Sequence, residues 1–137
     1  MNCKIKIKGN FKNGKANGFF KFYTQDGKLK AKGSFDNDEK EGLWNYYFPS
    51  HNTGYYKNGK KDGLWVYYNP YGGKSSERNY KEGIKEGEWV RYYKNGELFY
   101  RGNYSNGKKE GQWEYYNFDG TLMEHSSGTY KDDKKIS

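Results

Sequence analysis

One short pattern recurs along the chain and limits what it can fold into. Residues 104–120 read YSNGKKEGQWEYYNFDG, and closely similar strings occupy residues 56–72 and 80–96. Each unit contains Gly-x-aromatic, a Gly-bearing turn, a second Gly-x-aromatic, and a Tyr three residues later. Units begin at residues 9, 33, 54, 78, 102 and 128, the last being incomplete. This repetition predicts a single repeat domain over residues 1–137, in which each unit contacts mainly its neighbours.

The segments between the turns are short, rich in aromatic residues, and separated by Asn-Gly or Asp-Gly pairs. Those pairs favour type I′ turns, because Asn, Asp and Gly tolerate a positive φ. No window has the periodicity of a helix. The sequence therefore predicts an all-β fold without helices, an elongated single-layer antiparallel meander of about eleven strands.

The turns also predict which residues pair across strands. Centring a turn on Asn106 and Gly107 places Gly102 opposite Gly111 and Tyr100 opposite Trp113. The same rule pairs the glycines of two further units, Gly9 with Gly18 and Gly54 with Gly63. The unit that contains residues 48–54 is only 21 residues long, so the pairing there stays open.

The second turn of each unit places a large ring opposite a glycine. Centring it on Asn95-Gly96 or on Asp26-Gly27 puts Trp89 opposite Gly102 and Phe20 opposite Gly33, where the ring could shield the bare backbone. The recurring glycines are therefore interpreted as structural positions and not as a phosphate-binding loop, which would need a helix. These positions are Gly9, Gly18, Gly33, Gly42, Gly54, Gly63, Gly87, Gly102 and Gly111.

Composition supports an interior made of aromatic rings. Leu, Ile, Val and Phe together number 19 of 137 residues, and the net charge is +8, a combination typical of disorder. Aromatic residues, however, make up 20% of the chain, including 16 Tyr and four Trp. Because each ring buries a large apolar area, the chain can fold without an aliphatic core.

Since side chains alternate between the faces of a strand, the repeat also assigns residues to faces. One face collects the aromatic residues and holds the candidate binding residues Trp44, Trp65, Trp89, Arg91, Tyr100, Trp113 and Tyr115. The opposite face holds a candidate basic surface: Lys4, Lys6, Lys8, Lys28, Lys30 and Lys32, together with Lys21. Arg91 is expected to stack on Tyr100 and Tyr115, either as a local cation–π contact or as an anchor for an acidic ligand group.

The unit GxYxNGKxxGxWxxYY resembles the MORN repeat, and in particular its bacterial variant. Residues 102–116 carry the closest match, and the resemblance extends over residues 9–130. It implies an elongated β-ribbon that acts as a scaffold or binding module. Some bacterial proteins with this variant carry antitoxin-like names, which would be a special case of protein binding. Catalytic activities of proteins that join MORN repeats to an enzyme domain are not implied here.

Nothing in the sequence points to an enzyme, a metal site or a cofactor. His51 and His125 lie near predicted turns and lack the spacing of metal ligands. Carboxylates such as Asp62, Glu86 and Glu110 recur in every unit, which is typical of turn residues. Only three of the 25 basic residues are Arg, so specific nucleic-acid recognition is not expected.

The sequence thus predicts a non-catalytic module that binds a protein, a peptide or a second copy through its aromatic face or its open edges. One alternative is a carbohydrate or cell-wall binding module, because tandem W-x-Y-Y also resembles choline-binding repeats. Another is contact with anionic lipid through the lysines, which could equally serve to block edge-to-edge aggregation. We expect a cytoplasmic protein if Met1 is the native start, and an exported protein or a lipoprotein acylated at Cys3 if a leader precedes it.

Overall fold

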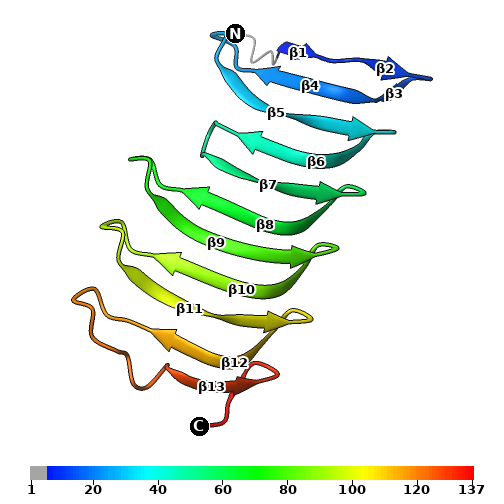
Figure 1. Ribbon diagram of the computed structural model, residues 1–137. Helices are drawn as coiled ribbons and strands as arrows, with labels where there is room; N and C mark the ends of the chain where they lie inside the picture. The colour runs from blue at the N-terminus through cyan, green and yellow to red at the C-terminus, as the bar shows by residue number, and fades with distance from the viewer. Residues whose placement is uncertain (1–5) are drawn as a thin grey trace.

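The computed structural model describes residues 6–137. Lys4 of the candidate basic surface and Cys3 lie outside the described residues. Across residues 6–137 the chain forms strands, turns and loops without a helix. Twelve strands make one open antiparallel sheet in the order β1-β4-β5-β6-β7-β8-β9-β10-β11-β12-β13-β14, and β2 pairs with β3. Figure 1 shows this single layer, with the two termini at opposite ends of the stack. The predicted elongated meander is confirmed.

The strands follow the repeat, and from the second unit onwards each unit contains two of them. In chain order they are β1 (Lys6–Lys8), β2 (Phe11–Lys12), β3 (Lys15–Ala16), β4 (Gly18–Tyr23), β5 (Leu29–Asp36), β6 (Glu39–Tyr46), β7 (Asn52–Lys57), β8 (Lys60–Tyr68), β9 (Lys74–Lys81), β10 (Ile84–Tyr92), β11 (Leu98–Ser105), β12 (Lys108–Tyr115), β13 (Gly128–Lys131) and β14 (Lys134–Lys135).

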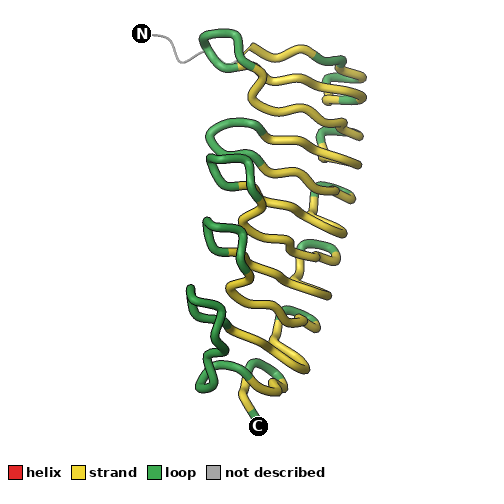
Figure 2. The backbone as a smooth tube through the Cα atoms, turned by 60° about the vertical axis from the view of Figure 1, so that its left-hand side comes forward, coloured by secondary structure: helices red, strands yellow, loops and turns green. Residues whose placement is uncertain are grey.

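Two kinds of turn join the strands, one kind at each end of the strands (Figure 2). At one end, both central residues of the turn have positive φ, as a type I′ turn requires; Asn106 has φ 50° and Gly107 has φ 84°. At the other end, Gly96 has a positive φ, and Tyr93 N–H donates to the Glu97 carbonyl. The turns centred on Asp26-Gly27 and Asn95-Gly96 are thus three-residue loops with a left-handed glycine, and the type I′ prediction is wrong there.

The predicted pairing holds next to the type I′ turns and then shifts. Asn103 lies opposite Glu110, as predicted, but Tyr100 lies opposite Tyr115 instead of Trp113. The predicted glycine pairs are wrong for the same reason. Gly54 pairs with Trp65 instead of Gly63. Gly9 and Gly102 lie at the points where the register shifts in their own units, so they do not pair with Gly18 and Gly111. The second glycine of each unit causes the shift. It adopts a positive φ, between 76° and 95° over Gly18, Gly42, Gly63, Gly87 and Gly111, and opens a bulge that takes up two extra residues.

The shift places each large ring over the first glycine of its own unit. Trp113 lies on Gly102, and a Cβ atom on that glycine would overlap the indole. The same holds for Phe20 on Gly9, Trp44 on Gly33 and Trp65 on Gly54. Trp89 lies opposite Gly102 and Phe20 opposite Gly33, as predicted, but Phe20 covers Gly9 instead, and Trp89 covers no glycine because Arg78 lies opposite it on the preceding strand.

The buried core of this single layer consists mainly of these rings. The indole N–H of Trp113 donates to the carbonyl of Asn103, at 3.1 Å, and Trp44, Trp65 and Trp89 make the equivalent bond. Trp44, Trp65 and Trp113 are at most 1% exposed. Each ring removes roughly 200 Å² of apolar surface from water, a gross stabilisation of about 5 kcal/mol.

The type I′ turns also connect successive units. The Gly107 N–H donates to the Lys85 carbonyl of the preceding hairpin, and the Asn106 N–H donates to a carboxylate oxygen of Glu86. Equivalent bonds lead from residue 58 to Glu41, from residue 82 to Asp62 and from residue 132 to Glu110. The recurring carboxylates are therefore hydrogen-bond acceptors for the next turn.

The short unit keeps a regular register. Strands β6 and β7 pair from Gly42↔Tyr56 to Tyr46↔Asn52 without a shift, which settles the pairing left open around residues 48–54. The missing residues come from the loop between these strands, which contains a cis Phe48–Pro49 bond.

We expect the two glycines of a unit to respond differently to alanine. Gly102→Ala forces a methyl group into the Trp113 indole and should lower the free energy of unfolding by about 3 kcal/mol. Gly111→Ala enters open space at φ 80° and should cost only about 1 kcal/mol for backbone strain. Urea denaturation followed by Trp fluorescence measures both, and an equal loss in the two variants would contradict this packing.

Candidate functional site

One face of the sheet carries two rows of aromatic rings, and we call it the aromatic face. The first row contains Phe11, Phe20, Phe35, Trp44, Tyr56, Trp65, Tyr80, Trp89, Tyr104, Trp113 and Tyr130. Most neighbours in this row meet edge to face, with ring centroids 5.0–6.4 Å apart. The second row contains Phe22, Tyr46, Tyr67, Tyr100 and Tyr115. The rings form a strip along the sheet whose ring-to-ring contacts are interrupted between Tyr67 and Tyr80, where Lys61 and Arg78 lie over rings on both sides.

The candidate binding residues occupy two levels of this face. The four predicted tryptophans lie underneath, with exposed fractions of 1% (Trp44), 1% (Trp65), 7% (Trp89) and 0% (Trp113). Tyr100 and Tyr115 are half-buried, with their rings 5.3 Å apart, and Arg91 is exposed. A partner that docks on this face would therefore touch tyrosines and cations, while the indoles support them from below.

A lysine of each of the four Trp-containing units lies over these rings. The Lys61 ammonium is 4.7 Å from the Trp65 ring centroid and 5.2 Å from that of Tyr80. Lys40, Lys85 and Lys109 are placed in the same way, 4.8–5.1 Å from the Trp of their own unit. The sequence analysis missed these four lysines. The signal was present, because each precedes its Trp by four residues and an even spacing puts both side chains on one face.

Arg78 makes the arginine contacts that were expected of Arg91. It stands at the position of the first glycine, and its guanidinium carbon is 4.3 Å from the Tyr67 ring centroid and 5.1 Å from that of Trp89. Arg91 lies on the same face, opposite Ser76 and Tyr100. Arg91 makes no cation–π contact with Tyr100 or Tyr115 in the described part of the chain, so the expected stack is not formed, and the arginine that stacks on rings is Arg78.

Four tyrosine hydroxyls of this face have a raised pKa and stay neutral well above pH 7. Burial, followed by the hydrogen bond to Tyr46, raises the pKa of Tyr56 to about 12; the two hydroxyl oxygens are 3.0 Å apart. Burial also raises the pKa of Tyr46, Tyr104 and Tyr115. The Lys40 ammonium donates to the Tyr46 hydroxyl at 2.8 Å. The face is therefore neutral at its hydroxyls and positive at its amines.

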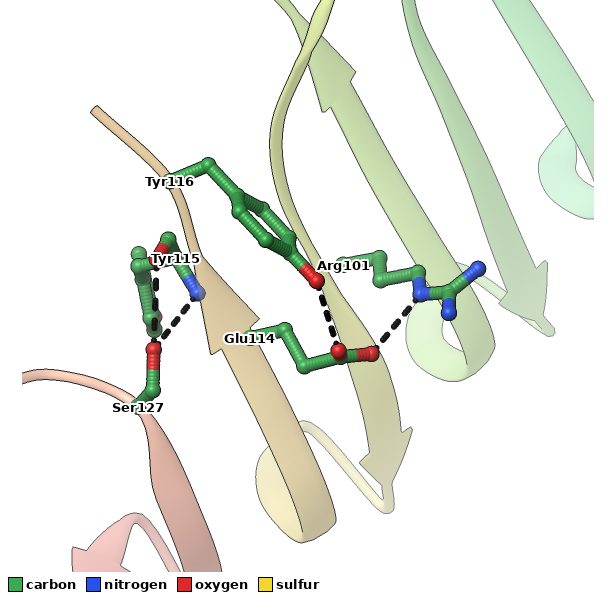
Figure 3. A network of polar contacts seen from close by, with 5 residues as sticks. All are labelled: Arg101, Glu114, Tyr115, Tyr116 and Ser127. Atoms are coloured by element: carbon green, nitrogen blue, oxygen red, sulfur yellow. Dashed lines mark hydrogen bonds and ion pairs between the residues drawn. The ribbon is translucent and has the colours of Figure 1, made fainter. Parts of the chain in front are cut away.

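The carboxylates of the strands project mainly from the other face. Among the described residues there are two ion pairs, Lys74–Glu77 and Arg101–Glu114, and both lie on that other face. Figure 3 shows Glu114 accepting hydrogen bonds from Arg101 and from the Tyr116 hydroxyl, which lower its pKa. Strand positions on the aromatic face of β5–β12 hold aromatic, small, amide and basic residues but no Asp or Glu.

Two shallow hollows open between the rings in the first half of the sheet. One, of about 280 Å³, is lined by Phe22, Lys30, Ala31, Lys40, Trp44 and Tyr46. The next, of about 250 Å³, is bordered by Tyr46, Tyr56, Lys61, Trp65 and Tyr67 together with the loop of residues 48–52. Lys30 thus borders the aromatic face, contrary to its predicted place on the basic surface, because the register shifts between the pairs Phe22↔Ala31 and Tyr23↔Leu29 and leaves Lys30 at a bulge.

The rest of the basic surface is clustered at the N-terminal end of the other face. Lys8 pairs with Lys21, and Lys21 pairs with Lys32, so three ammonium groups stand on adjacent strands. Lys6 lies opposite Tyr23, and Lys28 is exposed in the neighbouring loop. Several large apolar side chains on the same face are between 42% and 51% exposed: Phe19, Leu43, Tyr55 and Leu64.

Alkaline pH should destabilise the fold through the tyrosines. A tyrosine whose pKa is raised in the folded state contributes stability that is complete below its unfolded pKa of 10.0 and is lost as pH rises towards the folded value, about 12 for Tyr56. The urea midpoint should therefore fall steeply between pH 10 and 12. In Tyr56→Phe the fall should be smaller, and an identical pH profile in both proteins would contradict the assignment.

Within residues 6–137, no group of three or more His, Cys, Asp or Glu side chains is arranged to hold a metal ion. The part of the chain that the structure describes holds no helix long and apolar enough to cross a membrane. No protein-family model matches this sequence, and no curated protein matches it either.

Proposed function

We propose that this chain is a non-catalytic interaction module that binds a protein or peptide segment through its aromatic face. The observation that carries the proposal is a single-layer sheet whose strip of tyrosines and cations has no second layer over it among the described residues. A strip of half-buried tyrosines beside cationic side chains is typical of recognition sites. The resemblance to MORN repeats supports the same function.

The rigidity of the face also supports recognition. Each surface tyrosine is held by neighbouring rings. The hydroxyls of Tyr46, Tyr67 and Tyr115 also accept a hydrogen bond from a lysine of the same unit. A partner that docks here therefore orders few additional side chains, which lowers the entropic cost of binding.

Selection from a displayed random-peptide library tests this proposal without assuming a ligand. Binders selected on the wild-type chain should lose affinity for Lys85→Glu/Arg91→Glu, which reverses two exposed charges on the aromatic face. They should retain affinity for the matched control Lys21→Glu/Lys32→Glu on the other face. Binders that ignore the first variant and are lost with the second would contradict the proposal.

A second candidate function is contact with an anionic membrane surface. The observation that favours it is the register of Lys8, Lys21 and Lys32, beside the half-exposed ring of Phe19. Clustered lysines are attracted to anionic headgroups, and an apolar ring can enter the headgroup region.

Vesicle sedimentation checks this second function. The chain should sediment with phosphatidylcholine vesicles that contain phosphatidylserine, and dissociate at high salt. Lys8→Gln/Lys21→Gln/Lys32→Gln should abolish sedimentation, while Lys85→Gln/Arg91→Gln should not. Salt-independent binding, or equal binding to vesicles without phosphatidylserine, would refute this function.

A further inference from the structure

Building on the proposed function, we propose that the aromatic face takes an extended acidic segment in the polyproline II conformation, with a carboxylate at every third residue. The segment would run along the sheet, across the strands. Three features define this ligand: the sign of the charge, the spacing of the cations and the chemistry of the surface between them.

The sign of the charge follows from the side chains on the face. Lys40, Lys61, Lys85 and Lys109 form a column, and Arg78 stands between the second and third of them. An ammonium group has three donors, and Lys40 and Lys61 each make one hydrogen bond, to a tyrosine hydroxyl. With no carboxylate among the strand positions of this face, the column is complementary to an anion.

The spacing of the cations selects the conformation of the ligand. The four lysines stand on β6, β8, β10 and β12, so consecutive ammonium groups are two strands apart, about 9.6 Å. A polyproline II helix has three residues per turn and a rise of 3.1 Å per residue, so every third side chain points the same way at intervals of about 9.3 Å. Over the three intervals of the column the mismatch reaches only about 1 Å.

Other backbone conformations fit this column less well. Successive side chains on one face of an extended strand are about 6.6 Å apart. Their distance from the matching lysines therefore grows to about 6 Å, nearly two residues, after two intervals. An α-helix repeats a face after seven residues, about 10.5 Å, and accumulates about 3 Å over the column. Of these three repeats, polyproline II keeps its carboxylates nearest to all four lysines.

The surface between the lysines suits the same conformation. A polyproline II segment has no internal hydrogen bonds, so its carbonyls are free to accept from a hydroxyl donor such as Tyr104. Its proline rings pack well on aromatic side chains, which fill the space between consecutive lysines here.

Four labelled peptides test the inference by fluorescence anisotropy on the full chain. They are five repeats of Glu-Pro-Pro, a peptide of the same composition with irregularly spaced glutamates, five repeats of Gln-Pro-Pro, and five repeats of Lys-Pro-Pro. The regular acidic peptide should bind about tenfold more tightly than the irregular one, because several exposed ion pairs form together only when the spacings agree.

Variants locate the site. Lys61→Gln/Lys85→Gln should weaken binding of the regular acidic peptide about tenfold, while Lys21→Gln/Lys32→Gln on the other face should leave it unchanged. Lys61 and Lys85 both lie over a Trp ring, but Lys85 is the more exposed of the two, so the single variant Lys85→Gln serves as the check that folding is intact. It should reduce affinity by a smaller factor with an unchanged urea midpoint.

Each opposite result overturns the inference. Equal binding of the regular and irregular peptides removes the role of spacing, and equal binding of the glutamine peptide removes the role of charge while leaving an aromatic-face binding module intact. Displacement by a single-stranded DNA of equal charge as effectively as by the acidic peptide would reveal a general polyanion surface. Failure of all four peptides overturns this ligand, while the library selection decides the proposed function independently.

Discussion

The contact of a large ring with a bare glycine backbone is the interaction on which the rest of this structure depends. A single-layer sheet has no second layer to bury its side chains, so apolar area has to be buried within the layer itself. The indole of Trp113 meets this need by lying flat on Gly102 and donating its N–H to the next carbonyl. The bulge at Gly111 gives the strand the two residues that bring the ring into place. Glycine, bulge and ring therefore act together, and their repetition explains why the chain folds with so few aliphatic residues.

The sequence predicted the architecture because each local signal pointed the same way. Type I′ dipeptides, aromatic alternation and units of similar length all favour hairpins in one sheet. The register beyond the turns was mispredicted because a glycine with positive φ cannot be distinguished by spacing alone from a glycine that makes room for a ring. Both kinds recur with the same period, although Gly111 has φ 80° with open space above it and Gly102 lies under the Trp113 ring.

The candidate site was predicted in outline only. Tyr100, Tyr115 and Arg91 were correctly placed on the aromatic face, but the tryptophans beside them are covered. Their cover is partly lysine, a residue usually assigned to solvent. A lysine can lie over a ring because its aliphatic stem packs on apolar surface while the ammonium remains hydrated. Spacing within the repeat carried this information for Lys40, Lys61, Lys85 and Lys109, whereas the loss of glycine at residue 78 gave no hint that Arg78 would stack.

The hydrogen bonds that join each type I′ turn to the hairpin before it have a consequence for how such a chain can change in length. In each case a backbone N–H of the turn donates to a carboxylate of the preceding unit, which is Glu41, Asp62, Glu86 or Glu110. These units therefore present matching ends to one another. A duplication or deletion of one of these units would preserve the hydrogen bonds between neighbouring units and would change the length of the sheet by a fixed step of about 10 Å. The length of the sheet is therefore set by the number of repeat units.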